Sequence, residues 1–208
     1  KWSGRCLECG GWGTLQMQTV DQKTADKLIS VSPAEVIDLE KLGPPNESQR
    51  LKTNLEELDR VLGGGLMAGS LILLGGEPGI GKSTLVAQTA DAIGQNGQAV
   101  IYASGEESAG QIKVRFDRLG IKAANVKFLS ETNAEKIIAT IKKLKPSLVI
   151  IDSIQTIYLS SVAGEAGSLN QIRGSAVRFL ETAQASNVAI ILIGHITKDG
   201  AIAGPKSL

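Results

Sequence analysis

The sequence is short of several residue types, and each shortage excludes a class of protein. Two cysteines in 208 residues are too few for a disulfide framework. Two Trp, two Tyr and three Phe are too few for a large base-stacking platform. The longest apolar stretches, such as residues 188–193, fall far short of the roughly 20 residues that a membrane-spanning helix needs. We therefore expect a cytoplasmic protein with no membrane segment.

Positive and negative charges nearly cancel. The 22 Lys and Arg residues against 21 Asp and Glu residues leave a net charge of +1, which excludes a polybasic protein but not a local basic patch. Hydrophobic residues make up 42% of the chain, enough for a globular core, and 208 residues suit one domain with a small appendage. The 24 glycines exceed the usual share of about 7% and indicate functional loops.

From residue 55 onward, apolar runs alternate with amphipathic stretches. Strands are predicted at 70–74, 99–103, 126–129, 148–151 and 188–193, and helices at 55–62, 82–93, 107–119, 133–144 and 169–185. This alternation is typical of an α/β fold, a mostly parallel sheet with helices on both faces. Such sheets bind ligands at the carboxyl ends of their strands.

We expect three segments along the chain. Residues 1–18 hold both cysteines, the polar residues 19–54 predict a linker, and residues 55–208 predict the α/β domain. The chain begins with Lys1 rather than Met and ends within a loop that we expect to be functional, so we expect a fragment, trimmed at both ends, whose domain stops before its C-terminal end.

A phosphate-binding loop is predicted between the strand at 70–74 and the helix that follows. Residues 76–83 match G-x-x-x-x-G-K-[ST] in the strand–loop–helix context that this pattern requires. The glycines let several N–H groups point at one anion, and the helix N-terminus adds positive charge. Lys82 is expected to reach the β- and γ-phosphates, Ser83 to bind Mg²⁺ and Thr84 to contact the α-phosphate. The predicted nucleotide-binding residues are Gly76, Glu77, Pro78, Gly79, Ile80, Gly81, Lys82, Ser83 and Thr84, together with Asp152.

Further polar residues follow strands at the same edge. Asp152 ends an apolar strand, as in a Walker B motif, and can hold the water shell of Mg²⁺. Of two adjacent acids we favour Glu106 as the general base, while Glu107 is either the base or an acid that begins the next helix. His195, the single histidine, is a candidate γ-phosphate sensor or a structural histidine, and Gln155 is a weaker sensor candidate.

Two glycine-containing loops leave this edge, at residues 160–168 and 198–206. Lys198 and Lys206 make the second loop a candidate for contact with a charged polymer, and the alternative is that both are flexible surface loops.

The two cysteines form a C-x-x-C pair, Cys6 and Cys9, followed by a glycine. The pattern resembles one knuckle of a four-cysteine zinc site, which needs four ligands where this chain supplies two. The alternatives are a cysteine pair with no metal-binding role in this chain and a thioredoxin-like redox motif.

Taken together, these motifs resemble the bacterial RadA (Sms) family of RecA-like ATPases over essentially the whole chain. The matching stretches are KWSGRCLECG at 1–10, GEPGIGKST at 76–84, YASGEES at 102–108, VIIDSIQT at 149–156, GHITKDG at 194–200 and AGPK at 203–206. The phosphate loop alone is generic, whereas the cysteine knuckle and the GHITKDG stretch make the match specific.

The resemblance implies an ATP- and Mg²⁺-dependent DNA repair protein that binds single-stranded or branched DNA. The family moves DNA branches together with the RecA recombinase and forms hexameric rings. It places Glu106 at the catalytic glutamate, and His195 at a sensor position beside Lys82 and Asp152, because the sensor strand lies between the other two strands. It implies Zn²⁺ only for the intact protein, in which a second cysteine pair would complete the site. The family's Lys-Asn-Arg-Phe-Gly motif and Lon-protease-like domain are absent from this sequence.

Two other functions remain open at this point. One is a RecA-like nucleotide switch, similar to the circadian-clock ATPases, that acts on protein partners rather than DNA. The other is a scaffold that binds nucleotide without turnover. Stimulation of ATP hydrolysis by DNA would separate the DNA-dependent ATPase from the switch. A Glu106→Gln variant would lose hydrolysis but still bind ATP if the protein is such an ATPase, and would keep its function if the protein is a scaffold.

Overall fold

The computed structural model describes residues 36–41, 43 and 50–195. The chain divides into two units, Lys1–Pro45 and Asn46–Leu208. In the described part of the first unit, the short 3-10 helix η1 (Leu39–Lys41) carries an ion pair between Lys41 and Asp38. All elements described below belong to the second unit.

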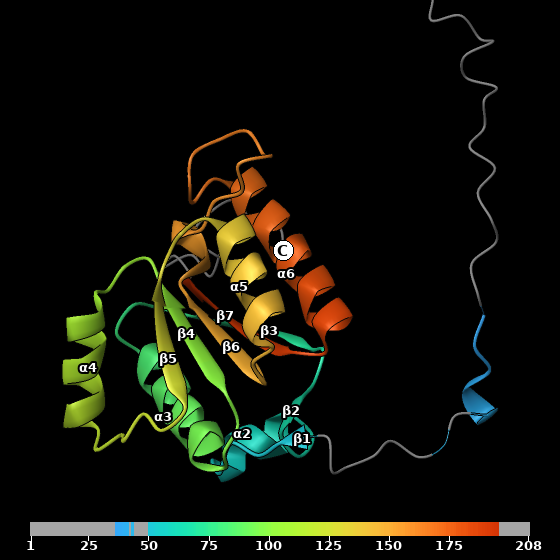
Figure 1. The fold of residues 1–208 in the computed structure, drawn as a ribbon, viewed down its shortest axis with the longest axis horizontal. Helices are drawn as coiled ribbons and strands as arrows, with labels where there is room; N and C mark the ends of the chain where they lie inside the picture. The colour runs from blue at the N-terminus through green and yellow to red at the C-terminus, as the bar shows by residue number, and fades with distance from the viewer. Residues whose placement is uncertain (1–35, 42, 44–49, 196–208) are drawn as a thin grey trace, which may run out of the picture. The chain divides into compact units, whose positions relative to one another are not determined.

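Five parallel strands form the sheet of the second unit, in the order β3-β7-β6-β4-β5 (Figure 1). They are β3 (Leu71–Gly76), β4 (Val100–Ser104), β5 (Val126–Ser130), β6 (Leu148–Asp152) and β7 (Ala189–His195). The order confirms the α/β class. It also places β7 between β3 and β6, as the family resemblance implies.

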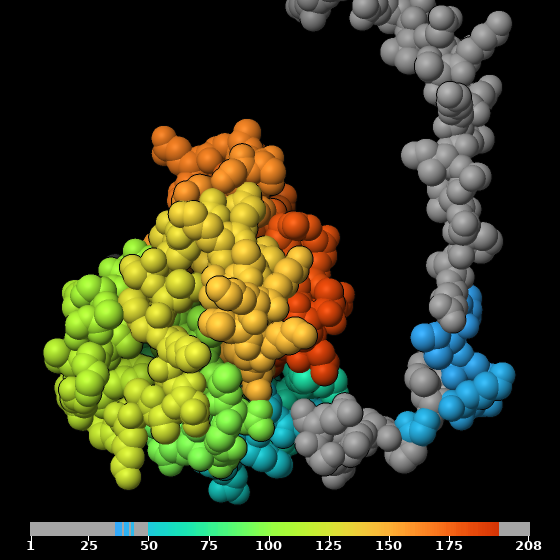
Figure 2. Space-filling model, viewed as in Figure 1, coloured from blue at the N-terminus to red at the C-terminus, as the bar shows by residue number. Residues whose placement is uncertain are grey.

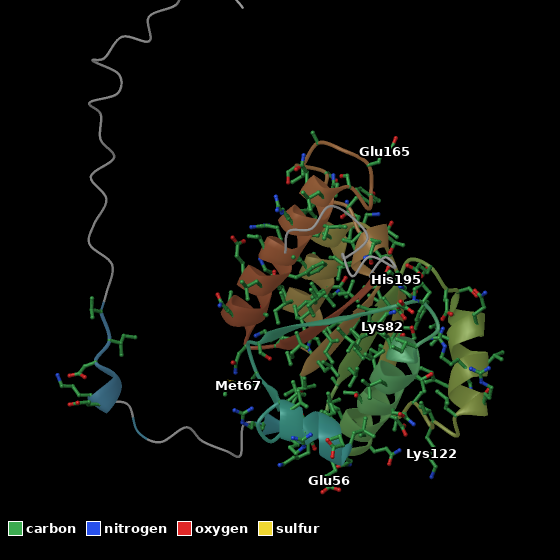
Figure 3. All side chains as sticks on the ribbon, turned by 180° about the vertical axis from the view of Figure 1, so that it is seen from behind. Glu56, Met67, Lys82, Lys122, Glu165 and His195 are labelled. Carbon is green, nitrogen blue, oxygen red and sulfur yellow. The ribbon has the colours of Figure 1, made fainter. Side chains whose placement is uncertain are left out.

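Helices cover both faces of this sheet. The helices α5 (Ala134–Leu144) and α6 (Leu169–Ser186) lie on the face toward the viewer in Figure 1, and α3 (Lys82–Gln95) covers the opposite face, seen in Figure 3. The helix α4 (Ala109–Arg118) packs beside β5. A separate hydrophobic core fills each face, and every residue of β4 and β6 is buried. Burial on both faces explains why these strands are continuous apolar runs.

A small antiparallel pair of strands stands outside the main sheet. β1 (Arg50–Leu51), in the segment predicted as a linker, pairs with β2 (Leu66–Met67), and α2 (Glu56–Val61) lies between them in the chain. Gly65 is required there, because its φ is +124° and a Cβ would lie 2.6 Å from the carbonyl oxygen of Leu51. Strands of two residues carry no periodic signal, so the sequence pattern did not predict them.

The remaining predicted helices and strands are confirmed to within two residues at each end. A short 3-10 helix, η3 (Ile154–Thr156), follows β6 and was not predicted. Among the described residues, no helix is long and apolar enough to cross a membrane.

Candidate nucleotide-binding site

The glycine-rich loop joins the carboxyl end of β3 to α3. Gly79 and Gly81 have φ values of +81° and +104°, a left-handed conformation that glycine adopts without steric strain. A Cβ at either position would meet no atom within 4 Å, so the space beside the loop is open. Because α3 begins at Lys82, directly after the loop, its N-terminal N–H groups are available to an anion held there.

The side chain of Lys82 folds back over the loop. Its Nζ donates hydrogen bonds to the carbonyl oxygens of Gly76 at 2.7 Å and Glu77 at 2.8 Å, and the residue is buried. Ser83 and Thr84 follow in the first turn of α3, while Pro78 and Ile80 are exposed. The ammonium group therefore already lies against the loop that the sequence pattern predicts to bind phosphates.

Asp152 ends β6 and is buried at the same edge. Its Oδ2 accepts a 2.6 Å hydrogen bond from the hydroxyl of Tyr102 and lies 4.0 Å from NH1 of Arg115. Burial, reinforced by the negative charge of Asp152, raises the pKa of Tyr102 far above its ordinary value. The hydroxyl therefore remains protonated and donates to the carboxylate. The peptide bond between Asp152 and Ser153 is cis.

The acid Glu106 faces residues at the carboxyl ends of two other strands. Its Oε1 accepts a hydrogen bond from the hydroxyl of Ser153, directly after β6. The same oxygen lies 3.4 Å from Nε2 of His195, the last residue of β7. Glu106 is thus the carboxylate that lies between the ends of β6 and β7.

The adjacent acid Glu107 has different surroundings. It forms an ion pair and a hydrogen bond with Arg115 of α4. The hydroxyl of Ser104 accepts hydrogen bonds from the backbone N–H groups of Glu106, at 3.2 Å, and Glu107, at 3.1 Å. This turn sends two neighbouring carboxylates in different directions.

The last residue of β7, His195, lies opposite Gly76 in the parallel pairing of β3 with β7. Figure 3 shows its side chain at the same edge as Lys82. Its Nδ1 is buried and has no hydrogen-bond partner within the described residues. Gln155, the weaker sensor candidate, donates from Nε2 to the backbone oxygen of His195 at 3.3 Å, so it holds the end of β7 rather than the imidazole.

The oxygen atoms available at this edge are suitable ligands for a nucleotide-bound Mg²⁺ ion. Mg²⁺ prefers oxygen ligands and is usually held by one or two protein groups together with phosphates and water. The hydroxyl of Ser83 and the carboxylate of Asp152 are donors of this type, and no hydrogen bond from another described residue reaches Oδ1 of Asp152. The described residues contain no group of three or more His, Cys, Asp or Glu that could hold a metal ion without the nucleotide.

The loop predicted at residues 160–168 projects at the top of the face in Figure 2 and is tied to the start of α6. The buried side chain of Gln171 accepts a hydrogen bond from the N–H of Leu159 at 2.7 Å. Its Nε2 donates to the carbonyl oxygens of Leu159, Val162 and Gly164, at 3.2, 2.6 and 3.1 Å. The first half of this loop is therefore wrapped around one buried amide.

Four predicted site residues lie outside the described residues: Cys6, Cys9, Lys198 and Lys206. The half zinc site and the lysine contacts stay predictions.

Tyr102, Arg115 and Ser153 form contacts at the site that the sequence analysis missed. A tyrosine in an apolar strand is one available signal, because a buried phenol needs a hydrogen-bond partner. An arginine next to Phe116 and three residues after Ile112, on the apolar face of α4, is a second signal.

Comparisons with known proteins agree with this geometry. The model of the AAA domain family matches residues 39–201. The DNA repair protein RadA of Bacillus subtilis (strain 168) is 41% identical over 216 residues, which cover 100% of this chain and 46% of that protein. The RadA of Aquifex aeolicus (strain VF5) is 45% identical over 211 residues, with coverage of 100% and 46%. The chain spans about half the length of the curated relatives it matches.

Two solved structures show the fold. A RadB recombinase superimposes with a TM-score of 0.52 and 24% identity over 72% of this chain and 71% of that one. A DnaB-like replicative helicase superimposes with a TM-score of 0.61 and 16% identity over 72% and 44%. The RecA-like fold and the similarity to bacterial RadA expected from the motifs are confirmed, and the chain belongs to the AAA domain family.

Proposed function

We propose that this chain is the nucleotide-hydrolysing part of an ATP-dependent DNA repair and recombination protein. The observation that carries the proposal is the position of Glu106, whose Oε1 lies between Ser153 and Nε2 of His195. A carboxylate at this place, next to a P-loop and a buried strand-terminal aspartate, has the surroundings that a base for attacking water needs.

Each residue of the site has a distinct proposed role. Lys82 exchanges its two carbonyl partners for β- and γ-phosphate oxygens. Ser83 would bind Mg²⁺ and Asp152 would hold its water shell, and the ion would neutralise charge on the phosphates. Glu106 takes a proton from the attacking water, and His195, in contact with Glu106, senses the γ-phosphate.

The DNA substrate and the partners are proposed from the relatives. Proteins that match the whole chain are named DNA repair proteins, and a recombinase shares the fold. We propose that the intact protein binds single-stranded or branched DNA and moves DNA branches together with the RecA recombinase. We also propose that it works in the cytoplasm as a ring of six copies. A net charge of +1 argues mildly against strong DNA affinity of one chain, because affinity depends on the number of phosphates contacted. A ring would add the charges of Lys198 and Lys206 from each copy.

The cysteine pair is proposed to supply two of the four thiolates of a structural zinc site. Zn²⁺ would bind to Cys6 and Cys9 only where a second pair completes the tetrahedron. Metal analysis of the intact protein, before and after Cys6→Ser, tests this: a zinc content that does not change removes the proposed site.

The first test is ATP hydrolysis by the full-length protein, with and without single-stranded DNA, at low and high salt. The proposal expects DNA to accelerate turnover and high salt to remove the acceleration, because phosphate contacts release counterions. If DNA does not change the rate of ATP hydrolysis at either salt concentration, the proposed dependence on DNA is overturned and the nucleotide switch is favoured. Nucleotide binding without turnover, unaffected by Glu106→Gln, favours the scaffold.

A further inference from the structure

Behind Asp152, which is predicted to hold the water shell of Mg²⁺, lies a series of polar contacts that the proposed chemistry does not use. It runs from Tyr102 on β4 to Asp152 on β6, then to Arg115 on α4 and back to Glu107 after β4. Tyr102 is fully buried, and the side chain of Arg115 is 15% exposed. Polar groups this deeply buried cost free energy unless they are paired.

The contacts that Tyr102 and Arg115 make with Asp152 both reach the same carboxylate oxygen, Oδ2. The hydroxyl of Tyr102 donates to Oδ2 at 2.6 Å, and NH1 of Arg115 lies 4.0 Å from Oδ2. The first is a short charge-assisted hydrogen bond, and the second is a contact between opposite charges that is too long for a hydrogen bond. Two groups from different elements therefore fix one oxygen of the carboxylate, and Oδ1 keeps its capacity to accept.

Both anchoring side chains are themselves held in place. The ring of Tyr102 packs edge-on against Phe116 of α4, with ring centres 6.1 Å apart and planes at 81°. The guanidinium of Arg115 is bound by Glu107 through NH2, which leaves NH1 toward Asp152. NH1 has no hydrogen-bond partner among the described residues, and it lies 4.0 Å from Oδ2 of Asp152.

We propose that Tyr102 and Arg115 are positioning residues for Asp152: they hold its Oδ2 so that Oδ1 is presented to the Mg²⁺–nucleotide complex, and Glu107 fixes Arg115 for this purpose. The inference rests on the proposed nucleotide site. It goes beyond that proposal because it assigns roles to three side chains to which the proposed chemistry gives none. Groups that orient a metal-binding carboxylate in this way usually affect metal affinity by about 10–100-fold.

The test measures magnesium dependence of nucleotide binding, not only turnover. The full-length protein and its Tyr102→Phe variant are titrated with a fluorescent N-methylanthraniloyl-ATP, in EDTA and over a series of Mg²⁺ concentrations. Affinity in EDTA should be the same for both, because the P-loop is unchanged. The Mg²⁺ concentration for half-maximal tightening should rise about tenfold or more in the variant.

Matched controls separate positioning from general damage. Tyr158→Phe removes a partly exposed hydroxyl elsewhere, and Arg118→Gln removes an exposed charge from the same helix as Arg115. Both should keep the wild-type Mg²⁺ response. Arg115→Gln should weaken the response, and Arg115→Lys should restore part of it, because a lysine keeps the charge opposite Asp152. The arginine pair also carries the test if Tyr102→Phe does not fold.

The outcomes distinguish this inference from the proposed function. Folded Tyr102→Phe and Arg115→Gln variants with a wild-type Mg²⁺ response overturn the inference and leave the ATPase proposal intact. A wild-type protein whose nucleotide affinity ignores Mg²⁺ overturns the inference as well. A shifted Mg²⁺ response in a protein that never hydrolyses ATP supports the inference and removes the proposed hydrolysis.

Discussion

Glu106→Gln and Glu107→Gln each remove one negative charge from neighbouring positions, yet the structure predicts different consequences. Glutamine at position 106 keeps a carbonyl oxygen that can accept from Ser153, so the local geometry should persist. It cannot take a proton from water. Glutamine at position 107 leaves the contacts of Glu106 with Ser153 and His195 in place but removes the anion that pairs with Arg115.

The expected magnitudes follow from these contacts. Loss of a general base costs about 10²–10⁴-fold in rate, equivalent to about 3–5 kcal/mol of activation free energy. Loss of the Glu107–Arg115 pair, whose side chains are 31% and 15% exposed, should cost about 1–3 kcal/mol of folding free energy. For a domain of this size that corresponds to a fall in melting temperature of about 2–4 °C for each kcal/mol.

The assay compares steady-state ATP hydrolysis, nucleotide affinity and thermal unfolding of the full-length protein and both variants. We expect Glu106→Gln to bind ATP and melt like the wild type while turnover is lost. Glu107→Gln should melt earlier and keep most of its turnover at saturating Mg²⁺. The reasoning is refuted if Glu107→Gln is inactive at an unchanged melting temperature while Glu106→Gln still hydrolyses ATP.

Three further substitutions have expected outcomes. Lys82→Ala should abolish ATP binding, measured by fluorescent-nucleotide titration, because the loop loses its buried cation. Gly105→Ala should lower both melting temperature and turnover, because the new Cβ would lie 2.4 Å from Cγ2 of Thr132 and push on the turn before Glu106. The pKa of Glu131 is lowered chiefly by a hydrogen bond from the N–H of Asn133, so its stabilisation exists above its ordinary pKa and disappears as the pH falls through the lowered value. Glu131→Gln should therefore lower the melting temperature at about pH 7, and its difference from the wild type should shrink as the pH falls through the lowered pKa.

The strands could be predicted because of where they lie in the sheet. β4 and β6 are covered on both faces, and a strand buried on both faces must be apolar throughout. Their order in the sheet is a different matter, since periodicity within one strand carries no information about its neighbours. The position of β7 between β3 and β6 was predicted from the family resemblance alone.

The phosphate loop could be predicted because its chemistry is local in sequence. Its glycines, lysine and serine follow one another within residues 76–83, and the left-handed φ values of Gly79 and Gly81 explain why glycine is needed. The partners of Asp152 could not be predicted in this way. Tyr102 lies 50 residues earlier in the chain, and only the pairing of β4 with β6 brings its hydroxyl to the carboxylate.

The choice between Glu106 and Glu107 shows the same limit at adjacent residues. Both acids follow the same strand, and nothing in their spacing says which one faces β7. Their directions depend on the turn that Ser104 stabilises and on Arg115, which lies eight residues after Glu107. A side chain's direction in a turn is thus set by tertiary partners as much as by its position in the sequence.

The same edge of the sheet links the nucleotide site to the loop before α6. Gln155 lies in η3, between the strand that ends in Asp152 and the loop held by Gln171, and it binds the backbone of His195. A shift of His195 on arrival of a γ-phosphate would therefore act on η3 and, through it, on a loop whose first half is held around a single amide. Residue 196 onward follows His195 directly in the chain, so the loop at 198–206, which is proposed to contact DNA, begins three residues after a residue of the nucleotide site. If nucleotide state is to change the affinity for DNA, the two sites need a structural connection of this kind. The connecting element must also have two discrete arrangements rather than deform continuously.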